Sequence, residues 1–466
     1  MHRFFVSAAH KSSGKTTVSL GLCAALRARG LSVQPFKKGP DYIDPLWLGE
    51  AAGRACRNLD FHLAQGPELT AQFARYGHDA QVCLVEGNKG LYDGLDLHGS
   101  NSNAALARLL DLPVVLVLEA RGMTRGIAPL ILGYQAFDPA LKIAGVILNR
   151  LGGARHEAKL RAVIEHYTDV AVLGAIHEDE RLVLSERHLG LIPANESSEA
   201  AQRIAVIGER VAAQVDLDRL LALTQTAVIL PTPLPAGPPA KTAVRIAIAR
   251  DAAFGFYYAD DLAAFAAAGA ELIPFDTLHD GHLPEADGLF IGGGFPESFL
   301  NELEANTSLR ANIHAAIEAG LPTYAECGGL MYLARSINWQ GRCRRMVGNI
   351  KGDVMMHPKP VGRGYVRLAT TAAHPWRAGA TSLPAHEFHY SSLEGLPADT
   401  RYAYRVERGF GIDGARDGIV HKNLLASYTH LRNSSAFDWV AQFVQFVADV
   451  RAAKAQQIPQ PQLCQQ

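Results

Sequence analysis

The chain has 466 residues, of which 48% are hydrophobic and 20% charged, and its formal net charge is −1 at pH 7. That length exceeds what one hydrophobic core supports and suits two to four domains of an ordinary globular protein. The balanced charge excludes an electrostatic case for nucleic acid or an anionic membrane surface as a partner. No apolar run approaches the ~20 residues that a membrane-spanning helix needs.

The cysteines are scattered and include no CxxC pair, so neither a disulfide framework nor a structural zinc site is predicted. The first residues enter a strand-like run directly and lack the shape of a signal peptide. A reducing cytoplasm is the expected location. The six cysteines are Cys23, Cys56, Cys83, Cys327, Cys343 and Cys464.

The first strand-like run, residues 3–8, leads into a glycine-containing loop, residues 9–17. Gly14, Lys15 and Thr16 form the core of a phosphate-binding loop, with Thr17 next to them. In such loops backbone N–H groups cradle phosphate oxygens, the lysine neutralises their charge and the hydroxyl ligates Mg²⁺. Ala9 stands where the pattern expects its first glycine, and a polar strand-to-helix turn is the alternative. The strand before and the helix after favour nucleotide binding.

Carboxylates stand on three separate loops of the same half of the chain, at or after predicted strands. Parallel strands carry ligand sites at their carboxyl ends, and Mg²⁺ on nucleotide phosphates needs only one or two carboxylates. Aspartate beside glycine or proline is also a common turn former, which is the alternative for each one singly. The predicted nucleotide contacts are Lys38, Asp41, Asp44 and Asp93, and the predicted Mg²⁺ ligands are Thr16, Asp41 and Glu86.

Short apolar runs alternate with helical patterns in both halves of the chain. This alternation predicts α/β domains with doubly wound, mostly parallel sheets covered by helices on both faces. The predicted strands are residues 3–8, 82–85, 113–118, 143–148, 170–175, 244–249, 288–291 and 321–325.

Residues 229–240 contain five prolines in twelve positions, which cannot continue a helix or a central strand. We therefore expect one domain at 1–228, a linker at 229–242 and a second domain at 243–450. A polar, glutamine-rich tail at 451–466 is expected to be disordered.

Cys327 follows the apolar run 321–325 and precedes two glycines and the helical pattern of residues 330–333. That order predicts a thiol on a sharp strand-to-helix turn, where the glycines avoid a Cβ clash. The start of the helix favours the thiolate, and backbone N–H groups around the turn, including that of Gly328, can receive a developing oxyanion. A buried structural cysteine is the alternative.

With these pieces in place, the chain resembles the cobyrinic acid a,c-diamide synthase family over residues 3–447. Its first half resembles the P-loop, dethiobiotin-synthetase-like amide ligases, and its second half a class I glutamine amidotransferase domain. The matching segments are residues 39–45 (Gly-Pro-Asp-Tyr-Ile-Asp-Pro), 86–87 (Glu-Gly), 90–94 (Gly-Leu-Tyr-Asp-Gly), 145–150, 249–254, 292–297 (Gly-Gly-Gly-Phe-Pro-Glu), 325–333 (Ala-Glu-Cys-Gly-Gly-Leu-Met-Tyr-Leu), 386–391 and 426–430.

The resemblance implies an enzyme with two reaction centres. Cys327 would attack the side-chain amide of glutamine and release ammonia, and His430 matches the histidine that activates the cysteine. Gly293 and Gly294, at a strand end, are further oxyanion candidates. The family uses the cysteine and histidine without an acidic third member, so no acid is assigned. In the first half ATP, with Mg²⁺, would activate a carboxylate as an acyl phosphate for attack by ammonia.

The substrate implied is a tetrapyrrole with carboxylate arms, amidated on its acetate side chains. Departures from the family pattern, such as Leu46-Trp47-Leu48 after Pro45, keep two relatives open as alternatives: sirohaem amidase and nickel-sirohydrochlorin diamide synthase. A more remote alternative is a P-loop ATPase switch without catalysis. A homodimer also stays open.

Four further positions carry no assigned chemistry. Trp47 could stack on a flat macrocycle or simply pack in the core. His386 and His389 could face the amidase centre, and Glu387 between them could instead orient a neighbouring loop.

Overall fold

The structure is a computed structural model, and it describes the chain except residues 185, 188–189, 198, 227–243, 377–380, 436 and 457–466. The chain divides into two compact units, Met1–Pro235 and Ala236–Gln466. The predicted linker at 229–242 lies wholly outside the described residues, and so does the predicted tail from residue 457 onward. Residues 451–456 were expected to be disordered, but they are helical because α13 (Trp439–Gln456) continues to Gln456.

The first unit is built on a seven-stranded sheet with the order β3-β2-β4-β1-β5-β6-β7, and every neighbouring pair in it is parallel. The phosphate-binding loop follows β1, and β2 and β4 are the next strands on one side, so three adjacent strands end near this loop. The strands are β1 (His2–Ala8), β2 (Val33–Lys38), β3 (Arg57–Leu59), β4 (Val82–Glu86), β5 (Val114–Glu119), β6 (Ile143–Leu151) and β7 (Val172–His177).

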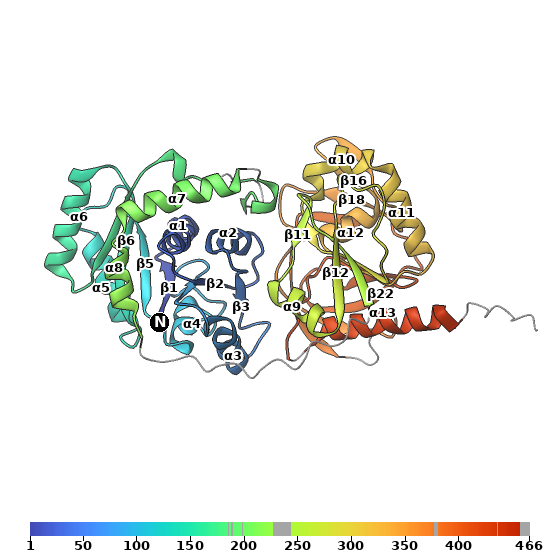
Figure 1. Cartoon of the computed structure of the whole chain (residues 1–466), viewed down its shortest axis with the longest axis horizontal. Helices are drawn as coiled ribbons and strands as arrows, with labels where there is room; N and C mark the ends of the chain where they lie inside the picture. Colours follow the sequence, from blue (N-terminus) through green and yellow to red (C-terminus); the bar gives the residue numbers. More distant parts are fainter. Residues whose placement is uncertain are drawn as a thin grey trace, which may run out of the picture. The chain divides into compact units, whose positions relative to one another are not determined.

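Helices cover both faces of this sheet, and alternation along the strands explains why. Phe4 and Val6 of β1 belong to a core shared with α1, α2, α7 and α8, whereas Phe5 points into a second core with α3, α4, α5 and α6. Figure 1 shows α1, α2 and α7 on one side of the sheet and α3 and α4 on the other. The helices are α1 (Lys15–Ala28), α2 (Ile43–Ala52), α3 (Gly66–Gly77), α4 (Asn103–Leu109), α5 (Ile127–Phe137), α6 (Ala154–Tyr167), α7 (Ala200–Gln214) and α8 (Leu217–Thr224), with 3₁₀ turns at Glu180–Leu182 and Ala194–Glu196 and a short β8 (Glu186–Arg187) and β9 (Gly190–Leu191) pair.

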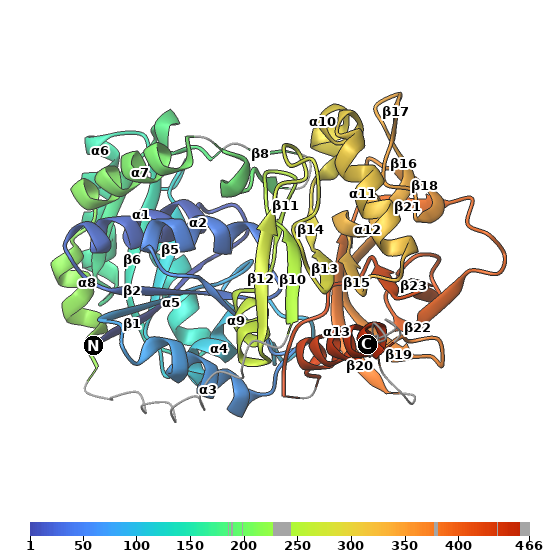
Figure 2. The same ribbon diagram turned by 45° about the vertical axis from the view of Figure 1, so that its right-hand side comes forward.

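The second unit has a nine-stranded mixed sheet with the order β12-β10-β13-β15-β24-β23-β22-β19-β20. Pairs from β12 to β24 are parallel, and pairs from β24 to β20 are antiparallel. Figure 2 shows β12, β10, β13 and β15 side by side. The strands are β10 (Val244–Ala249), β12 (Ala270–Phe275), β13 (Gly288–Ile291), β15 (Thr323–Glu326), β19 (Gly362–Thr370), β20 (Ser382–His389), β22 (Arg401–Arg408), β23 (Arg416–His421) and β24 (Leu424–Ser427).

Helices again cover both faces of the sheet. Ala247 and Ala249 of β10 pack in a core with α10, α11 and α12, while Ile246 and Ile248 pack in a core with α9 and α13. The helices are α9 (Ala259–Ala267), α10 (Leu300–Ala305), α11 (Thr307–Glu318), α12 (Gly328–Leu333) and α13, with a 3₁₀ turn at Pro296–Phe299. Two small sheets complete the unit: β11 (Phe254–Phe256) with β14 (Gly293–Gly294), and β17 (Arg342–Arg345), β16 (Ala334–Trp339), β18 (Ile350–Met356) and β21 (Ser391–Glu394).

The predicted fold class is confirmed, and each apolar run predicted as a strand is one. The antiparallel part of the second sheet is an addition that the alternation of strands and helices did not predict. Among the described residues, none of the helices combines the length and apolar character that crossing a membrane requires.

Candidate active sites

The phosphate-binding loop joins β1 to α1 and needs glycine at position 14. Gly14 has φ 86°, and a Cβ there would lie 2.1 Å from Nδ2 of Asn149. That amide donates a hydrogen bond to the carbonyl oxygen of Ser13 at 2.9 Å, which holds the loop against β6. The first N–H groups of the 14-residue helix α1 are therefore presented at the carboxyl edge of the sheet, as phosphate binding requires.

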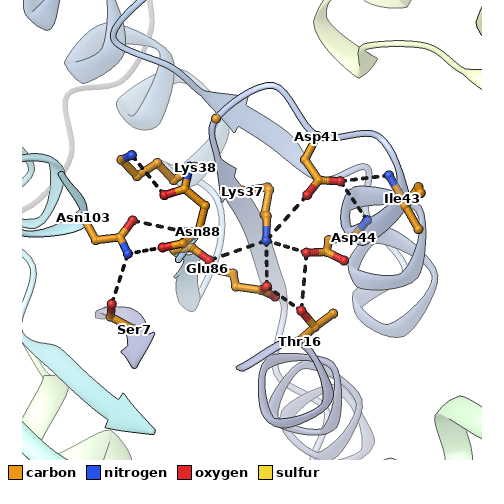
Figure 3. Close-up of polar contacts among 12 residues, drawn as sticks. Ser7, Thr16, Lys37, Lys38, Asp41, Ile43, Asp44, Glu86, Asn88 and Asn103 are labelled. Carbon is orange, nitrogen blue, oxygen red and sulfur yellow. Dashed lines mark hydrogen bonds and ion pairs between the residues drawn. The ribbon is translucent and has the colours of Figure 1, made fainter. Parts of the chain in front are cut away.

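The Thr16 hydroxyl lies among carboxylates that come from two other elements. It donates to Oε1 of Glu86 at 2.9 Å and to Oδ2 of Asp44 at 3.3 Å. Glu86 ends β4, and Asp44 lies in the first turn of α2. Figure 3 shows these side chains converging from separate parts of the chain. The structure thus brings three of the predicted nucleotide and metal residues together.

Lys37 stands at the centre of this group, and the sequence reasoning gave it no role of its own. Its Nζ lies 2.5 Å from Oδ2 of Asp44, 2.8 Å from Oε1 of Glu86 and 3.8 Å from Oδ2 of Asp41 (Figure 3). Burial lowers the pKa of Lys37, but the carboxylates of Asp44, Glu86 and Asp41 outweigh it and hold the pKa well above its ordinary value. The available signal was a pair of lysines ending a buried strand, where apolar residues are the rule.

Asp41 has a different role from Asp44 in this structure. Its Oδ1 accepts hydrogen bonds from the backbone N–H groups of Ile43 at 3.0 Å and Asp44 at 3.1 Å, so it caps the start of α2. The contact to Thr16 comes from Asp44 instead. Residues 37–45, which carry Asp41 and Asp44, are therefore the end of β2, a short turn and the first residues of α2, and not one continuous loop.

The remaining predicted nucleotide residues lie on the neighbouring loops of the same edge. Lys38 donates to Oδ1 of Asn88 at 3.2 Å, and burial lowers its pKa to about 8. Asp93 accepts from the N–H of Gly90 at 2.9 Å, so it shapes its own loop. Burial also lowers the pKa of Lys15, against the opposing effect of Glu86. Thr17 is half-buried in the first turn of α1.

Within the described part of the chain, no group of three or more His, Cys, Asp or Glu side chains forms a ready metal site. A Mg²⁺ ion that arrives with nucleotide phosphates needs fewer protein ligands. The oxygens of Asp44 and Glu86 already bind a cation, the Lys37 ammonium, and the Thr16 hydroxyl contacts both carboxylates, so this donor set suits Mg²⁺.

In the second unit, Cys327 stands at a strained turn between β15 and α12. Its φ of 47° and ψ of −103° are rare for a residue with a side chain. Two backbone hydrogen bonds hold the turn. The N–H of Cys327 donates to the carbonyl oxygen of Ser427 at 2.8 Å, and the N–H of Met331 donates to the carbonyl oxygen of Cys327 at 3.0 Å. The side chain is buried. This is the strand-to-helix turn that the sequence predicts.

His430 reaches the thiol because β24 is the parallel neighbour of β15, with Ser427 opposite Glu326. Burial lowers the pKa of His430, but its interactions with Cys327 and Glu326 raise it to about 10. The His430 backbone is paired to His386 on β20, with its N–H on that carbonyl at 2.8 Å, and the two rings stack 4.9 Å apart. The predicted cysteine and histidine are therefore in contact, although 103 positions separate them.

The three predicted oxyanion glycines gather around this pair. A Cβ on Gly293 would lie 2.7 Å from Cε1 of His430, and one on Gly328 would lie 2.8 Å from the carbonyl oxygen of Gly294. A Cβ on Gly294 would meet the carbonyl oxygen of Ala253 at 1.9 Å. The close approach of the His430 ring at Gly293, and of neighbouring backbone at Gly294 and Gly328, thus requires glycine at these positions, whichever N–H groups meet the oxyanion.

Asp417, on β23, is a supporting residue that sequence reasoning missed. Its buried carboxylate accepts the N–H groups of Gly418, Tyr428 and Thr429 at 2.8, 3.1 and 3.0 Å and the Thr429 hydroxyl at 2.8 Å. It therefore ties the segment before His430 to the next strand. Nothing in its sequence context separates this aspartate from an ordinary turn residue.

Two open questions from the sequence are answered by contacts. Glu387 accepts the N–H groups of Phe410 at 2.7 Å and Gly411 at 2.8 Å, so it orients a neighbouring loop, and the His389 ring stacks on Tyr428 at 4.0 Å. Trp47 is 3% exposed and donates from its indole to the carbonyl of Ile192, so it packs in the core and offers no face to a macrocycle.

Comparison with known proteins agrees with this geometry. Residues 5–192 match the family described as the CobQ/CobB/MinD/ParA nucleotide binding domain, and residues 245–436 match the CobB/CobQ-like glutamine amidotransferase domain. A cobyrinate a,c-diamide synthase of Magnetococcus marinus is 45% identical over 453 residues, covering 95% of this chain and 97% of that protein.

Proteins of the same name from Methanosarcina acetivorans and Listeria innocua are also similar. The first is 40% identical and the second 39% identical, and they cover 97% and 92% of this chain and 97% and 96% of their own lengths. With nearly full coverage in both directions, the chain belongs to the cobyrinate a,c-diamide synthase family.

Proposed function

We propose that this protein is an ATP- and glutamine-dependent ligase that converts acetate side-chain carboxylates of cobyrinate into amides. The observation that carries the proposal is the contact between Cys327 and His430 in a chain that also holds a phosphate-binding loop facing a cluster of carboxylates. One centre releases ammonia and the other activates the acid that receives it.

In the second unit, Cys327 is the nucleophile for glutamine. His430 takes the thiol proton, the thiolate attacks the amide carbon, and His430 returns the proton to the departing ammonia. Water then hydrolyses the thioester to glutamate. Backbone N–H groups of Gly293, Gly294 and Gly328 are the candidates for stabilising the oxyanion formed in both steps.

In the first unit, the substrate carboxylate attacks the γ-phosphoryl group of ATP, and ammonia displaces phosphate from the resulting acyl phosphate. Lys15 and the start of α1 hold the phosphates. Mg²⁺, when bound, neutralises charge on the phosphate oxygens. The residues proposed to contact the nucleotide are Gly14, Lys15, Thr16, Thr17, Lys38, Asp41, Asp44 and Asp93, and those proposed to hold Mg²⁺ are Thr16, Asp41, Asp44 and Glu86.

The two alternatives, a sirohaem amidase and a switch without catalysis, are less well supported for separate reasons. The three relatives described above carry the name cobyrinate a,c-diamide synthase, so sirohaem amidase is not favoured. A switch without catalysis would not need a cysteine and histidine held in contact at a strained turn. Parallel incubations with cobyrinate, sirohaem and nickel-sirohydrochlorin, read by mass spectrometry, separate the substrates and count the amides. A cytoplasmic location and a homodimer remain predictions.

The two centres can be tested one at a time. Cys327→Ser should abolish synthesis from glutamine and retain synthesis from ammonium, because only the source of ammonia is lost. Lys15→Ala should abolish both and leave the folded protein intact. Loss of ammonium-dependent synthesis in a folded Cys327→Ser protein would contradict separate centres.

A further inference from the structure

We propose that Glu326 is the carboxylate that orients His430 and stabilises its protonated form, so that the glutaminase centre has an acidic member directly before its nucleophile in the chain. The inference rests on the proposed roles of Cys327 and His430 and adds a positioning residue to them.

The contacts of the Glu326 carboxylate divide between its two oxygens. Oε2 lies 3.4 Å from Nδ1 of His430, and both side chains are almost completely buried, at 4% and 3% exposure. Oε1 accepts the Tyr324 hydroxyl at 2.6 Å and the backbone N–H of Leu431 at 2.8 Å. One oxygen is therefore held by the backbone next to the histidine, and the other is directed at the ring.

The backbone explains how neighbouring residues can serve one imidazole. Side chains alternate between the faces of a strand, so Glu326 shares a face with Tyr324, whose hydroxyl it binds. Cys327 would point to the opposite face if β15 continued, but its positive φ turns the chain out of the strand. The elbow thus allows the thiol and the preceding carboxylate to meet His430 from different sides.

Among the described residues, Cys327 and Glu326 are the side chains whose interactions raise the pKa of His430. The His386 ring stacks on His430, and its Nδ1 lies 3.3 Å from the Tyr258 hydroxyl. The guanidinium of Arg432 lies over the Tyr258 ring and pairs with Asp260 at 3.1 Å. Glu326 is the carboxylate in contact with the imidazole.

This arrangement sets the proton positions that the reaction needs. In this proposal Nδ1 carries a proton directed at Glu326, 3.4 Å away, so Nε2 is the nitrogen that takes the proton from Cys327. The resulting imidazolium lies between thiolate and carboxylate. Burial alone would lower the pKa of His430, and Cys327 and Glu326 together raise it to about 10, so the positive charge is held at neutral pH.

A purely structural role for Glu326 is the competing explanation, and Glu326→Gln separates the two. Glutamine can still accept from Tyr324 and Leu431 through its amide oxygen, but it carries no charge. In the full-length protein we expect kcat for glutamine hydrolysis to fall about 10²- to 10⁴-fold, with KM for glutamine changed less than about threefold. Ammonium-dependent synthesis should be unchanged.

The pH profile of glutamine hydrolysis distinguishes an electrostatic role of Glu326 from a packing role, because a loss of packing alone would not shift it. The alkaline limb of kcat/KM for glutamine reports loss of the His430 proton, and it should shift to lower pH in Glu326→Gln because the imidazolium loses a stabilising charge. Glu318→Gln is the matched control. Glu318 contacts His421 at 2.8 Å, and His421 pairs with Leu424 at the start of β24, whereas His430 follows the end of that strand, so the replacement should leave kcat and the limb unchanged.

Wild-type kcat in Glu326→Gln, or a lowered kcat with an unmoved alkaline limb, would overturn the proposal. A measurement on the unaltered protein covers the case in which the variant does not fold. In histidine-labelled protein, ¹⁵N shifts should show both ring nitrogens of His430 protonated at neutral pH, and Nδ1 should keep its proton when the ring becomes neutral at alkaline pH. A neutral ring protonated on Nε2 alone would overturn the proposal. Glutamine hydrolysis that survives Cys327→Ser would instead refute the proposed function.

Discussion

At the scale of single residues, Lys37 is a buried lysine whose positive charge is stabilised by neighbouring carboxylates. It is 3% exposed, and Glu86 beside it is fully buried. Removing one partner of a buried pair leaves an uncompensated charge, which typically costs about 3–5 kcal/mol. We therefore expect Lys37→Met to lower the free energy of unfolding of the first unit by about that amount, measured by urea denaturation.

The matched control for Lys37 is the double variant Lys37→Met/Glu86→Gln, which removes both charges. It should recover part of the lost free energy, since coupled residues do not contribute additively. Equal stability of the single and double variants would contradict an ion-paired Lys37.

Gly293 gives a prediction of a different kind, because the space around it is the constraint. A methyl group there would lie 2.7 Å from the His430 ring and 3.2 Å from Cβ of Phe256, so the ring must move. We expect Gly293→Ala to lower glutaminase kcat at least tenfold while ammonium-dependent synthesis persists. Gly281→Ala is the control, since a Cβ there meets only Oγ of Ser308, at 3.8 Å. Equal glutaminase rates in the two variants would show that the ring tolerates the methyl group.

At the scale of elements, the end of β24 depends on a carboxylate from β23. Asp417 accepts the backbone N–H groups of Tyr428 and Thr429, the first two residues after β24, and the Thr429 hydroxyl. Asp417→Asn replaces one acceptor oxygen by an NH₂ donor that would face these donors. We expect about 2–4 kcal/mol of destabilisation in the second unit and a lowered glutaminase rate, measured by denaturation and glutamine hydrolysis. A stable variant with an undisturbed rate would mean that other contacts hold His430.

The same scale shows what a sequence can reveal. Buried parallel strands read as continuous apolar runs, so β1, β4 and β15 could be predicted with the loops that follow them. The antiparallel strands β19 and β22 mix exposed and buried positions and gave no such run. The roles of Trp47 and Asp44 could be assigned only from contacts. Trp47 packs in the core because α2 turns it inward. Asp44, and not Asp41, accepts the hydrogen bond from Thr16, because Asp41 caps the start of that helix.

Lys37 and Glu326 were overlooked for a common reason. Both are charged residues near the ends of buried strands. In each case the sequence assigned a role to the next residue, Lys38 or Cys327, and not to the charged residue before it. Spacing along a chain predicts which loops meet, but the oxygen or nitrogen that a side chain presents depends on packing from distant strands.

At the scale of the whole molecule, each unit has its own pair of hydrophobic cores among the residues that the structure describes. We therefore expect two calorimetric transitions. ATP with Mg²⁺ should raise only the transition of the first unit, by about 2.7 kcal/mol of stabilisation at a concentration 100 times Kd. Lys15→Ala should lose this shift, and a single transition that nucleotide shifts as a whole would contradict independent cores.

The direct succession of Glu326 and Cys327 has a consequence for how glutamine hydrolysis can be controlled. One peptide bond joins the nucleophile to the carboxylate, so no sliding of strands separates these two. The histidine belongs to another strand, and its position depends on the turn after β24, on Asp417 and on the backbone pairing with His386. We therefore expect a change that stops glutamine hydrolysis without unfolding the sheet to act on that turn, residues 428–431, by moving His430 away from the thiol.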